Sequence, residues 1–482
     1  MSFTIRTADH EPHKEHYVRT DRRLSPVHRT RLLRPLLLAA CTALTAVPAL
    51  AVEHKAAEQK KAETPAASTE LLAFPGAQGW AAHTPGGRGG QIIRVTTLAD
   101  KGPGSFLEAL KAKGPRVIVF EVGGIIDMKG EEIEIDEPYL TIAGQTAPNP
   151  GITLIRAGVN IRAHDVIIQH IRVRTGTAGM AKRTGWEPDA MGTIAAANVI
   201  VDHCSMSWSI DENLSSSGKR FIGATPEEWR QHTSHAITFS NNILAEGLAN
   251  ATHAKGEHSK GSLIHDNVSD ILIIGNLYAH DAERNPLFKG GVHGQIINNL
   301  IYDPGQRAVH YNLIAAEWGD HPFQVGKISL VGNVMRAGPS TPNDVALFEL
   351  GGAGDVELYM KDNIAVDRIG RPMPMLGRYT TSPAKIIEVK TGPAFPEGVK
   401  PLAAVDVEDS VIANAGARPW ERDEVDWRVI ADTIEGRGKI IDSEQEVGGY
   451  PVQLATFKAF DPSEWDLRYM TPKVAPTYKA IH

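Results

Sequence analysis

Short runs of β-branched and other apolar residues recur along the chain from Leu72 onward, separated by turns rich in Gly, Asn and Asp. Seven of these runs are alike, because each places a His or an Asn directly before an apolar residue. The intervals between these positions run from 23 to 39 residues. The shortest interval suits one coil of a parallel β-solenoid, and the longer ones suit a coil with an inserted loop. The seven positions are His170, His203, Asn242, Asn276, Asn299, Asn333 and Asn363.

The stacking of coils gives this repeat a physical reason. In a parallel stack, equivalent residues of successive coils lie about 4.8 Å apart. Stacked Asn side chains hydrogen-bond to one another and satisfy a bend in every coil, while inward Val, Ile and Leu form one continuous core. The pattern therefore predicts an all-β parallel β-helix over residues 70–380. A β-sandwich with Asn in ordinary turns is the alternative, and seven matches at the same place in a strand argue against it.

A short helix is predicted before the repeats, in the sequence GPGSFLEALKAKGP at 102–115. Ser105 and Glu108 fit a capping box, and Leu107 and Leu110 are expected to face the core. A helix that closes the open end of a solenoid removes an exposed sheet edge, so we expect a cap at this end.

The repeat pattern fades after about Arg368. Residues 381–482 are therefore expected to form an irregular C-terminal extension that packs on the β-helix, rather than a second domain. Within this extension, residues 418–436 mix Pro, Trp and charged residues, which indicates a helix flanked by loops.

Residues 1–51 have the features of a secretory signal peptide: a basic flank, an apolar stretch and a small-residue ending. The apolar run is too short to predict a transmembrane span. The sequence LAAC, which ends at Cys41, also resembles a lipobox and would make that cysteine a lipid anchor. Arg34 and Pro35 would leave such a signal a very short apolar region, so cleavage at the end of the segment is preferred. We expect a disordered spacer at 52–69 and a secreted protein, extracellular or periplasmic.

The chain carries a formal net charge of −7 at pH 7, and 22% of its residues are charged. Residues 1–51 hold more basic than acidic residues, so the cleaved protein would be more acidic. This balance argues against broad nucleic-acid binding, which requires a basic surface. A protein of this charge that handles an acidic polymer needs a local cationic cleft or a bridging metal cation. After cleavage Cys204 is the only cysteine, so no intrachain disulfide is expected.

Six stretches share their order and content with one known family. The stretch 189–208 ends in a hydrophobic-Asp-His signature, and 283–299 contains an Arg-x-Pro-x-x-Lys sequence close to an Arg-x-Pro-x-x-Arg motif. The other four are 73–98, 117–128, 139–148 and 237–247. On these motifs the chain resembles the pectate lyases of polysaccharide lyase family 1, and its tail resembles that of secreted bacterial members. The resemblance covers about residues 73–370 and implies a right-handed parallel β-helix.

The resemblance implies β-elimination on a 4-linked galacturonan such as polygalacturonate. A base removes the C5 proton beside the uronate carboxylate, the glycosidic oxygen at C4 leaves, and an unsaturated sugar end forms. Negative charge develops on the carboxylate, so the site must place fixed positive charge there. Calcium suits this task because it takes several oxygen ligands and can bridge carboxylates of protein and substrate. The expected partner is an acidic polysaccharide, bound by a monomer with Ca²⁺ as cofactor.

One arginine and two lysines are the candidates for catalysis and substrate binding. In the family motif the first arginine is taken as the base, and that position is Arg284. The alternative is that Arg284 stays charged and a water or hydroxide takes the proton, since a free guanidinium stays protonated. Lys289 replaces the second arginine of the motif and keeps its charge without its bidentate geometry. Lys260 resembles the family's substrate-binding lysine, and Lys255 in the insertion-like run 248–258 competes with it.

The resemblance also implies a calcium site made of acidic side chains. Asp189 matches the first ligand position, and Asp211 matches the first member of an Asp-x-x-x-Asp pair. Ser215 replaces the second member, which weakens the site or shifts ligation to Glu212. His203 is interpreted as a structural residue of the Asn ladder. No histidine pair has a convincing zinc-ligand spacing.

Three rival functions stay open at this stage. A β-helix glycoside hydrolase of the polygalacturonase type needs paired carboxylates around the bond, for which Asp202, Asp211 and Glu212 are available. That reading leaves the Arg284 motif unexplained. A non-catalytic protein that binds or adheres to uronate glycans is the second rival, because two positions depart from the family motifs. A lyase for another uronate polymer is the third.

Overall fold

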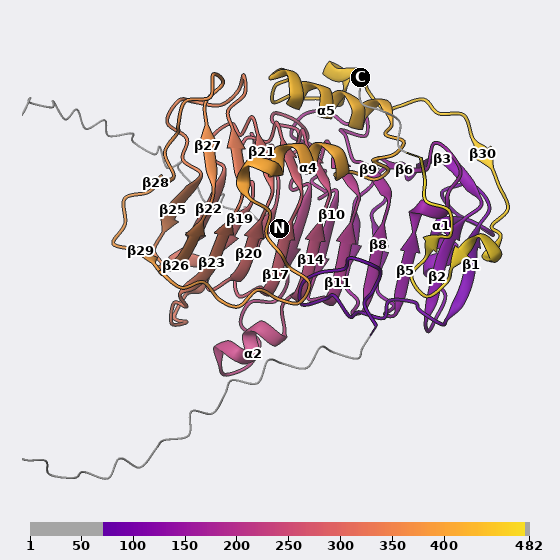
Figure 1. Ribbon diagram of the computed structural model, residues 1–482, viewed down its shortest axis with the longest axis horizontal. Helices are drawn as coiled ribbons and strands as arrows, with labels where there is room; N and C mark the ends of the chain where they lie inside the picture. Colours follow the sequence, from indigo (N-terminus) through magenta and orange to yellow (C-terminus); the bar gives the residue numbers. More distant parts are fainter. Residues whose placement is uncertain (1–70, 478–482) are drawn as a thin grey trace, which may run out of the picture. The chain divides into compact units, whose positions relative to one another are not determined.

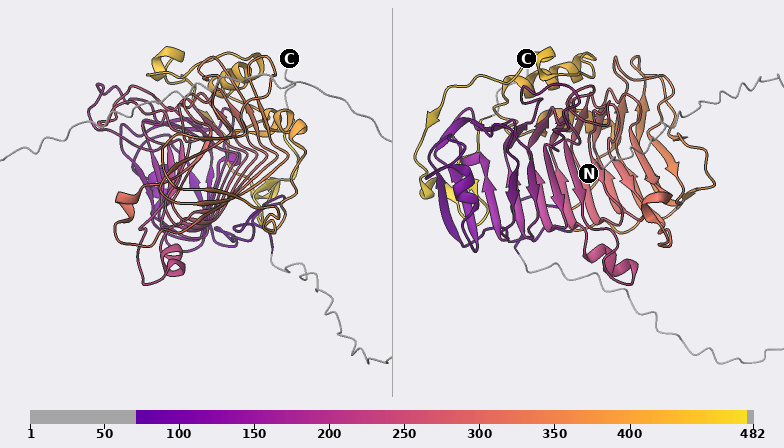
Figure 2. Two further views of the ribbon diagram at one scale, coloured as in Figure 1. Left: turned by 90° about the vertical axis from the view of Figure 1, so that its left-hand side faces the viewer. Right: turned by 180° about the vertical axis from the view of Figure 1, so that it is seen from behind.

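Three long parallel β-sheets enclose a common core and form a right-handed parallel β-helix (Figure 1). The structure is a computed structural model that describes residues 71–477. We call the three sheets I, II and III, and their strands are given below. In each coil the chain contributes a strand to sheet I, then to sheet II, then to sheet III. Figure 2 shows, in its left view, how successive coils repeat behind one another. The fold class predicted from the repeat is confirmed.

Each sheet takes one strand from each coil, and only the last strand added to sheet II is antiparallel. Sheet I consists of β1 (Gln91–Val95), β2 (Arg116–Phe120), β5 (Leu140–Ala143), β8 (Val166–Gln169), β11 (Ala197–Asp202), β14 (His235–Ser240), β17 (Ser269–Ile274), β20 (His293–Ile297), β23 (Gly326–Val331), β26 (Val356–Lys361) and β29 (Ile386–Glu388). Sheet II consists of β3 (Val122–Asp127), β6 (Ile152–Ile155), β9 (Ile171–Arg174), β12 (Ser205–Ser207), β15 (Ile243–Ala245), β18 (Leu277–Ala279), β21 (Leu300–Tyr302), β24 (Val334–Arg336), β27 (Ile364–Val366) and β30 (Thr456–Phe457). Sheet III consists of β4 (Ile133–Ile135), β7 (Val159–Ile161), β10 (Met191–Ile194), β13 (Leu214–Ser217), β16 (Leu263–Ile264), β19 (Leu287–Lys289), β22 (Val309–Leu313), β25 (Phe348–Gly352) and β28 (Leu376–Arg378).

The remaining elements are short and lie between or after the coils. The α-helices are α1 (Phe106–Leu110), α2 (Pro226–Gln231), α3 (Ala315–Trp318), α4 (Val407–Asn414) and α5 (Glu424–Glu435). The 3-10 helices are η1 (Gly144–Thr146), η2 (Ala404–Asp406), η3 (Glu444–Val447) and η4 (Pro462–Glu464), and β31 (Trp465–Asp466) pairs with β32 (Thr471–Pro472).

In seven successive coils, a single residue in the left-handed backbone region turns the chain from sheet I to sheet II. Gly adopts this region freely, and Asn and Asp tolerate it better than other residues. The turn thus accounts for the small polar residues that follow each strand of sheet I. The turn residues are His170 (φ 59°), His203 (φ 49°), Asn241 (φ 54°), Gly275 (φ 69°), Asn298 (φ 53°), Gly332 (φ 64°) and Asp362 (φ 51°).

In the last five of these coils the residue after the turn is an asparagine, and these asparagines form a ladder. In this ladder each Nδ2 donates to the Oδ1 of the Asn in the next coil at 2.9–3.1 Å. The same Oδ1 accepts the backbone N–H of the preceding ladder residue at 2.9–3.0 Å. Donors and acceptors of the bend are therefore satisfied without water. The ladder residues are Asn242, Asn276, Asn299, Asn333 and Asn363.

His170 and His203 do not belong to this ladder, contrary to the sequence interpretation. The strand register places His203 level with Asn241, one residue before the ladder, and places Cys204 at the ladder level. The backbone N–H of Cys204 donates to the Oδ1 of Asn242 at 2.8 Å, so the ladder ends there. The two histidine rings instead stack at the turn, with centroids 5.2 Å apart. Both precede an apolar residue, which is why the pattern grouped them with the ladder.

Helix α1 packs into the N-terminal end of the core, as predicted for a cap. The hydroxyl of Ser105 accepts the backbone N–H of Glu108 at 3.2 Å. Phe106 and Leu110 are buried, whereas Leu107 is only partly buried. Because positions i, i+3 and i+4 share one face of a helix, Phe106 takes the core position that the sequence assigned to Leu107.

The C-terminal segment runs back along the outside of the coils, and α4 and α5 lie against sheet II (Figure 1). Helix α5 begins after Asp423, whose carboxylate accepts the backbone N–H of Asp426, and it confirms the helix predicted within 418–436. Strand β30 pairs with β3 of an early coil. The apolar contact is made by Ala404, Val407, Val411, Ala415, Val429 and Ile430 with Ile243, Ala245, Leu277, Ala279, Leu300, Tyr302 and Val334.

Several sequence predictions lie outside the described residues. These are the signal peptide at 1–51, the lipid anchor at Cys41 and the spacer at 52–69. Between residues 71 and 477, no helix combines the length and the apolar character that crossing a membrane requires.

The ladder gives the first testable prediction. Asn276→Ala would remove the acceptor of the backbone N–H and of one amide hydrogen of Asn242, and the side-chain donor to the carbonyl of Phe239 and the Oδ1 of Asn299. Since each unpaired buried polar group costs about 1–3 kcal/mol, we expect a loss of roughly 3 kcal/mol in the free energy of unfolding. Asn363→Ala, at the partly exposed end of the ladder, should cost clearly less. Denaturant unfolding of both variants measures this difference, and equal losses would contradict the ladder's role.

Candidate active site

The loops that connect sheet II to sheet III bring charged side chains of successive coils together. Glu212, Lys260 and Glu283 are bridge partners in neighbouring coils. Continuing the register between β10 and β13 by two residues places Asp189 level with Glu212. Residues 23 to 48 positions apart in the chain therefore form one column of charges, which we call the charge column.

Arg284, beside this column, is held in an unusual backbone conformation. Its φ is 63°, in the left-handed region that costs a residue with a side chain roughly 1–3 kcal/mol. Its carbonyl accepts the N–H of Ser262 at 2.6 Å, and the N–H of the following Asn285 donates to the carbonyl of Ala308 at 3.2 Å. Hydrogen bonds to both neighbouring coils thus fix the backbone at a position where the sequence predicted a catalytic arginine.

The guanidinium of Arg284 lies among carboxylates. It forms an ion pair with Glu212, and its Nη1 lies 3.7 Å from the Oδ1 of Asp211. The side chain is 23% exposed. Burial lowers the pKa of Arg284, and the charges of Asp211 and Asp189 oppose this effect. A lowered pKa is the direction that a base requires, while the carboxylates keep the side chain in place.

Three carboxylates form a second feature, the acidic trio of Asp189, Asp211 and Glu212. Oxygen atoms of all three lie within 4.8 Å of one another. One oxygen of Asp189 accepts the N–H of Glu212 at 3.0 Å, and the other accepts the hydroxyl of Ser215. Ser215, which stands where the family has an aspartate, therefore acts as a donor to Asp189. Sequence analysis named all three carboxylates, and the structure brings them together.

The acidic trio changes the protonation of Asp189. Burial and the nearby charge of Asp211 raise the pKa of Asp189 to about 8, although the Ser215 hydroxyl and Arg284 act in the opposite direction. This carboxyl therefore keeps its proton to a higher pH than a free aspartate does. A cation bound to the trio would need the ionised form, so binding of a cation and release of a proton are coupled.

Lys260 lies in the charge column as a cation between two carboxylates. Its ammonium pairs with Glu283, which also pairs with Arg307 from the next coil. Burial raises the pKa of Glu283, but the charges of Lys260, His310 and Arg307 outweigh it and lower the pKa to about 2. The competing candidate Lys255 is exposed on its loop.

Lys289 is not brought into this cluster. It lies at the end of β19, level with Asn312 of the next coil. Its ammonium is 2.8 Å from Glu317 of α3, which also pairs with Arg220 at 2.7 Å. The side chain is buried in that contact, so its charge is committed to Glu317.

Asp202, which the hydrolase reading needs, lies on the opposite side of the coil. It ends β11 of sheet I, and its carboxylate pairs with His203 at 2.8 Å and accepts the Ser240 hydroxyl at 2.8 Å. These residues line a separate cleft of about 1030 Å³ together with Trp420 of the C-terminal segment. Asp202 therefore cannot work with Asp211 or Glu212 on one glycosidic bond.

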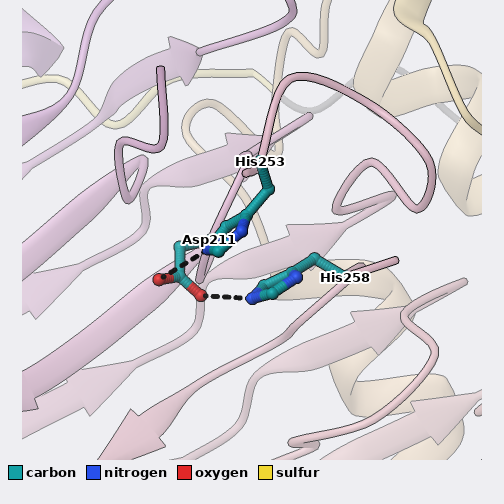
Figure 3. A group of neighbouring side chains, drawn as sticks. All are labelled: Asp211, His253 and His258. Carbon is teal, nitrogen blue, oxygen red and sulfur yellow. Dashed lines mark ion pairs between the residues drawn. The ribbon is translucent and has the colours of Figure 1, made fainter. Parts of the chain in front are cut away.

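Sequence analysis missed two histidines at the site. His253 and His258 come from the run 248–258, and both rings lie against Asp211 (Figure 3). The unusual run was visible in the sequence, but the spacing of its histidines matched no familiar metal motif. Only the folded loop shows that both reach a carboxylate of the acidic trio.

The raised pKa of Asp189 predicts how stability depends on pH without a divalent cation. The folded protein keeps a proton that the unfolded chain loses above about pH 4, so this group's stabilisation is lost as pH rises from about 4 to about 8. Asp189→Asn should make the melting temperature fall less steeply between pH 5 and pH 8. Thermal unfolding in chelator measures this, with Asp136→Asn, an exposed surface site, as control. Identical pH slopes for Asp189→Asn and the parent chain would refute the assignment.

Comparison with known proteins gives relatives with the same fold and similar sequence. A probable pectate lyase C of Neosartorya fischeri is 32% identical over 388 residues, which cover 80% of this chain and 82% of the relative. A probable pectate lyase C of Aspergillus fumigatus is 31% identical over 387 residues, with 80% and 82% covered. No family model matches the chain.

Solved structures agree with this likeness at the level of the fold. The major cedar pollen allergen Jun a 1 has a TM-score of 0.50 and 17% identity, covering 70% of this chain and 92% of the allergen. A pectate lyase described for its substrate specificity and anti β-elimination mechanism has a TM-score of 0.50 and 14% identity, covering 72% of this chain and 98% of the enzyme. Taken together with the curated relatives, these findings show that the chain belongs to the pectate lyase family.

Proposed function

We propose that the protein is a pectate lyase that cleaves 4-linked galacturonan by β-elimination, with Arg284 as the base. The observation that carries this proposal is the position of Arg284. Its backbone is held in the left-handed region, and its guanidinium lies near the carboxylates of Asp211 and Glu212. The chain that carries this arrangement belongs to a family of lyases. Left-handed residues also form the structural turns of this fold, so the support for function comes from the carboxylates around the guanidinium and from the family motif in which Arg284 lies.

The reaction has a balanced course. The base takes the proton from C5, the electron pair of that C–H bond forms the C4–C5 double bond, and the bond from C4 to the glycosidic oxygen breaks. The leaving oxygen takes up a proton, and an unsaturated sugar end results. Because negative charge grows on the uronate carboxylate, cations fixed beside it lower the barrier. Lys260 and Arg307 are the cations of this chain that meet this need.

Lys260 and Arg307 would have to leave their ion pairs with Glu283 to bind the substrate carboxylate. Lys260 and Arg307 are each paired with Glu283. A uronate carboxylate would compete with Glu283 for these cations, which favours a charged substrate over a methylated one. Arg284 is likewise paired with Glu212, so its action as a base requires that Glu212 take another partner.

The acidic trio is the place that fits Ca²⁺. All of its donors are carboxylate oxygens, which this ion prefers, and the buried Oδ1 of Asp211 has no hydrogen-bond partner among the described residues. Asp189, Asp211 and Glu212 would hold the ion. When bound, it would supply positive charge that bridges carboxylates of protein and substrate. Glu212 belongs both to the trio and to the Arg284 pair, so cation binding and release of Arg284 are linked.

The proposal extends to the parts of the chain around the site. Residues 1–51 would be a secretory signal peptide, followed by a spacer at 52–69. Residues 70–380 would be the catalytic β-helix and residues 381–482 the extension on its outside. The protein would be exported, act as a monomer and meet its polymer outside the cytoplasm.

Ultraviolet absorbance of the unsaturated product tests the proposed activity on de-esterified polygalacturonate. We expect absorbance to rise with calcium and to stop with chelator. Arg284→Ala should lower kcat about 10³-fold, as expected for loss of a general base. Arg371→Ala, which removes an exposed arginine, is the matched control and should keep full activity.

Other outcomes of this assay would favour other functions. New reducing ends without absorbance would indicate hydrolysis and would overturn the lyase proposal. Retained binding of uronate polymers with no product would indicate a non-catalytic glycan-binding protein.

Substitution of Lys260 and of Lys289 should affect the kinetics of the reaction differently. Lys260→Ala should raise KM about tenfold or more, because a charge-assisted bond to substrate is lost. Lys289→Ala should change kcat/KM less than about twofold, since Lys289 lies outside the charge column and pairs with Glu317 of α3. Steady-state kinetics on oligogalacturonates, with melting temperatures as a folding control, decide between them. Equal losses would mean that Lys289 reaches substrate after all.

A further inference from the structure

The loop 248–258 brings two imidazoles to one carboxylate of the acidic trio (Figure 3). The Nε2 of His258 lies 3.5 Å from the Oδ1 of Asp211, and the Nε2 of His253 lies 3.7 Å from the Oδ2. His253 is 1% exposed, and its Nε2 has no hydrogen-bond partner among the described residues. These contacts are longer than hydrogen bonds, so something besides direct bonding must explain the approach.

The hydrogen bonds of the other ring nitrogens determine where each neutral ring carries its proton. The Nδ1 of His253 accepts the backbone N–H of Lys255 at 3.1 Å, so the proton of His253 is on Nε2. The Nδ1 of His258 lies 3.3 Å from the carbonyl oxygen of Gly256, which can only accept, so the proton of His258 is on Nδ1. The two stacked histidines therefore differ in what they present to Asp211: His253 presents an N–H donor, and His258 presents a nitrogen lone pair.

His253 presents a donor. Its Nε2–H is directed toward the carboxylates of Asp211 and Glu187, at 3.7 and 3.5 Å. Glu187 also accepts the N–H of Ala254 at 2.7 Å and so holds the loop. At these distances His253 attracts the Asp211 carboxylate electrostatically without a hydrogen bond to it, which makes it a positioning residue rather than a ligand.

His258 presents a lone pair. In a neutral ring whose Nδ1–H faces the carbonyl of Gly256, Nε2 carries a lone pair. That lone pair faces the Oδ1 of Asp211, which has no hydrogen-bond partner among the described residues and lies 3.7 Å from the Nη1 of Arg284. Two electron-pair donors that face each other in a buried site are stabilised by a cation between them.

The separation of the two donor atoms, His258 Nε2 and Asp211 Oδ1, agrees with a cation between them. Two ligand atoms at 2.0–2.2 Å from a tetrahedral metal lie roughly 3.3 Å apart. The observed separation of 3.5 Å is close to this value. A bond from the second ring nitrogen to a backbone carbonyl, as His258 makes to Gly256, is typical of metal-binding histidines. Only one of the stacked rings has to coordinate, so the stack of His253 on His258 can persist.

We propose that Asp211 and His258 bind a divalent transition metal of the cobalt, nickel or zinc class, with His253 as a positioning residue. Imidazole nitrogen suits these metals, whereas calcium takes oxygen ligands. Asp189 and Glu212 lie within reach of Asp211 and can add oxygen ligands. The inference concerns the cation site of the proposed lyase and rests on that proposal only for the metal's part in the reaction.

Titration of the chelator-treated full chain with Co²⁺ tests this proposal through visible absorption, which needs no activity. We expect one equivalent to bind, Zn²⁺ to displace it, and His258→Gln to weaken binding at least about 30-fold. Since His253 acts through Asp211, His253→Gln should weaken binding less, about tenfold. His232→Ala, which removes an exposed histidine at the end of α2, should leave binding unchanged. Melting temperatures of all variants show whether each folds.

Equal Co²⁺ affinity in the His258→Gln variant and the parent chain, or no Co²⁺ binding at all, would overturn the metal assignment. The result can be separated from the lyase proposal. A chain that forms unsaturated product with calcium but binds no Co²⁺ refutes only the transition-metal site. A chain that binds Co²⁺ through His258 and forms no product refutes only the lyase.

Discussion

The in-register stacking of coils is the constraint on which the rest of this structure depends. Each coil's strands bond to the coil before and the coil after, so a residue's neighbours are set by its place within the coil. The Asn ladder reinforces this register from the inside, because each amide donates both to the ladder residue of the next coil and to a backbone carbonyl of the coil before it. A shift of one residue would break the ladder and turn apolar residues out of the core.

The same stacking explains the electrostatics of the site. The charge column runs through Asp189, Glu212, Lys260 and Glu283, so cations and anions alternate from Glu212 onward. Alternation lets opposite charges neighbour each other in a partly buried place. At the start of the column two carboxylates are adjacent, and burial together with the charge of Asp211 raises the pKa of Asp189. Adjacent carboxylates in such a column repel each other, and a bound metal ion or a neighbouring arginine reduces this repulsion.

The loops between sheet II and sheet III differ in length from coil to coil, and this difference determines which side chains reach the site. The coils themselves repeat, whereas the connection before β16 is long enough to fold back over Asp211. That loop adds nitrogen donors to a cluster of carboxylates in which a serine replaces one acidic residue. The stacked scaffold thus fixes the position of the chemistry, and the loops decide its ligands.

The sequence by itself determined the coil repeat, the ladder from Asn242 to Asn363, the cap at the N-terminal end and the motif around Arg284. These features are local patterns that recur at the coil period, so they can be read without coordinates. Only the tertiary structure decided that His203 belongs to the turn, that Lys260 and not Lys289 joins the charge column, and that loop histidines meet Asp211. Strand register and loop folding set these contacts, and both depend on neighbours that are distant in the chain.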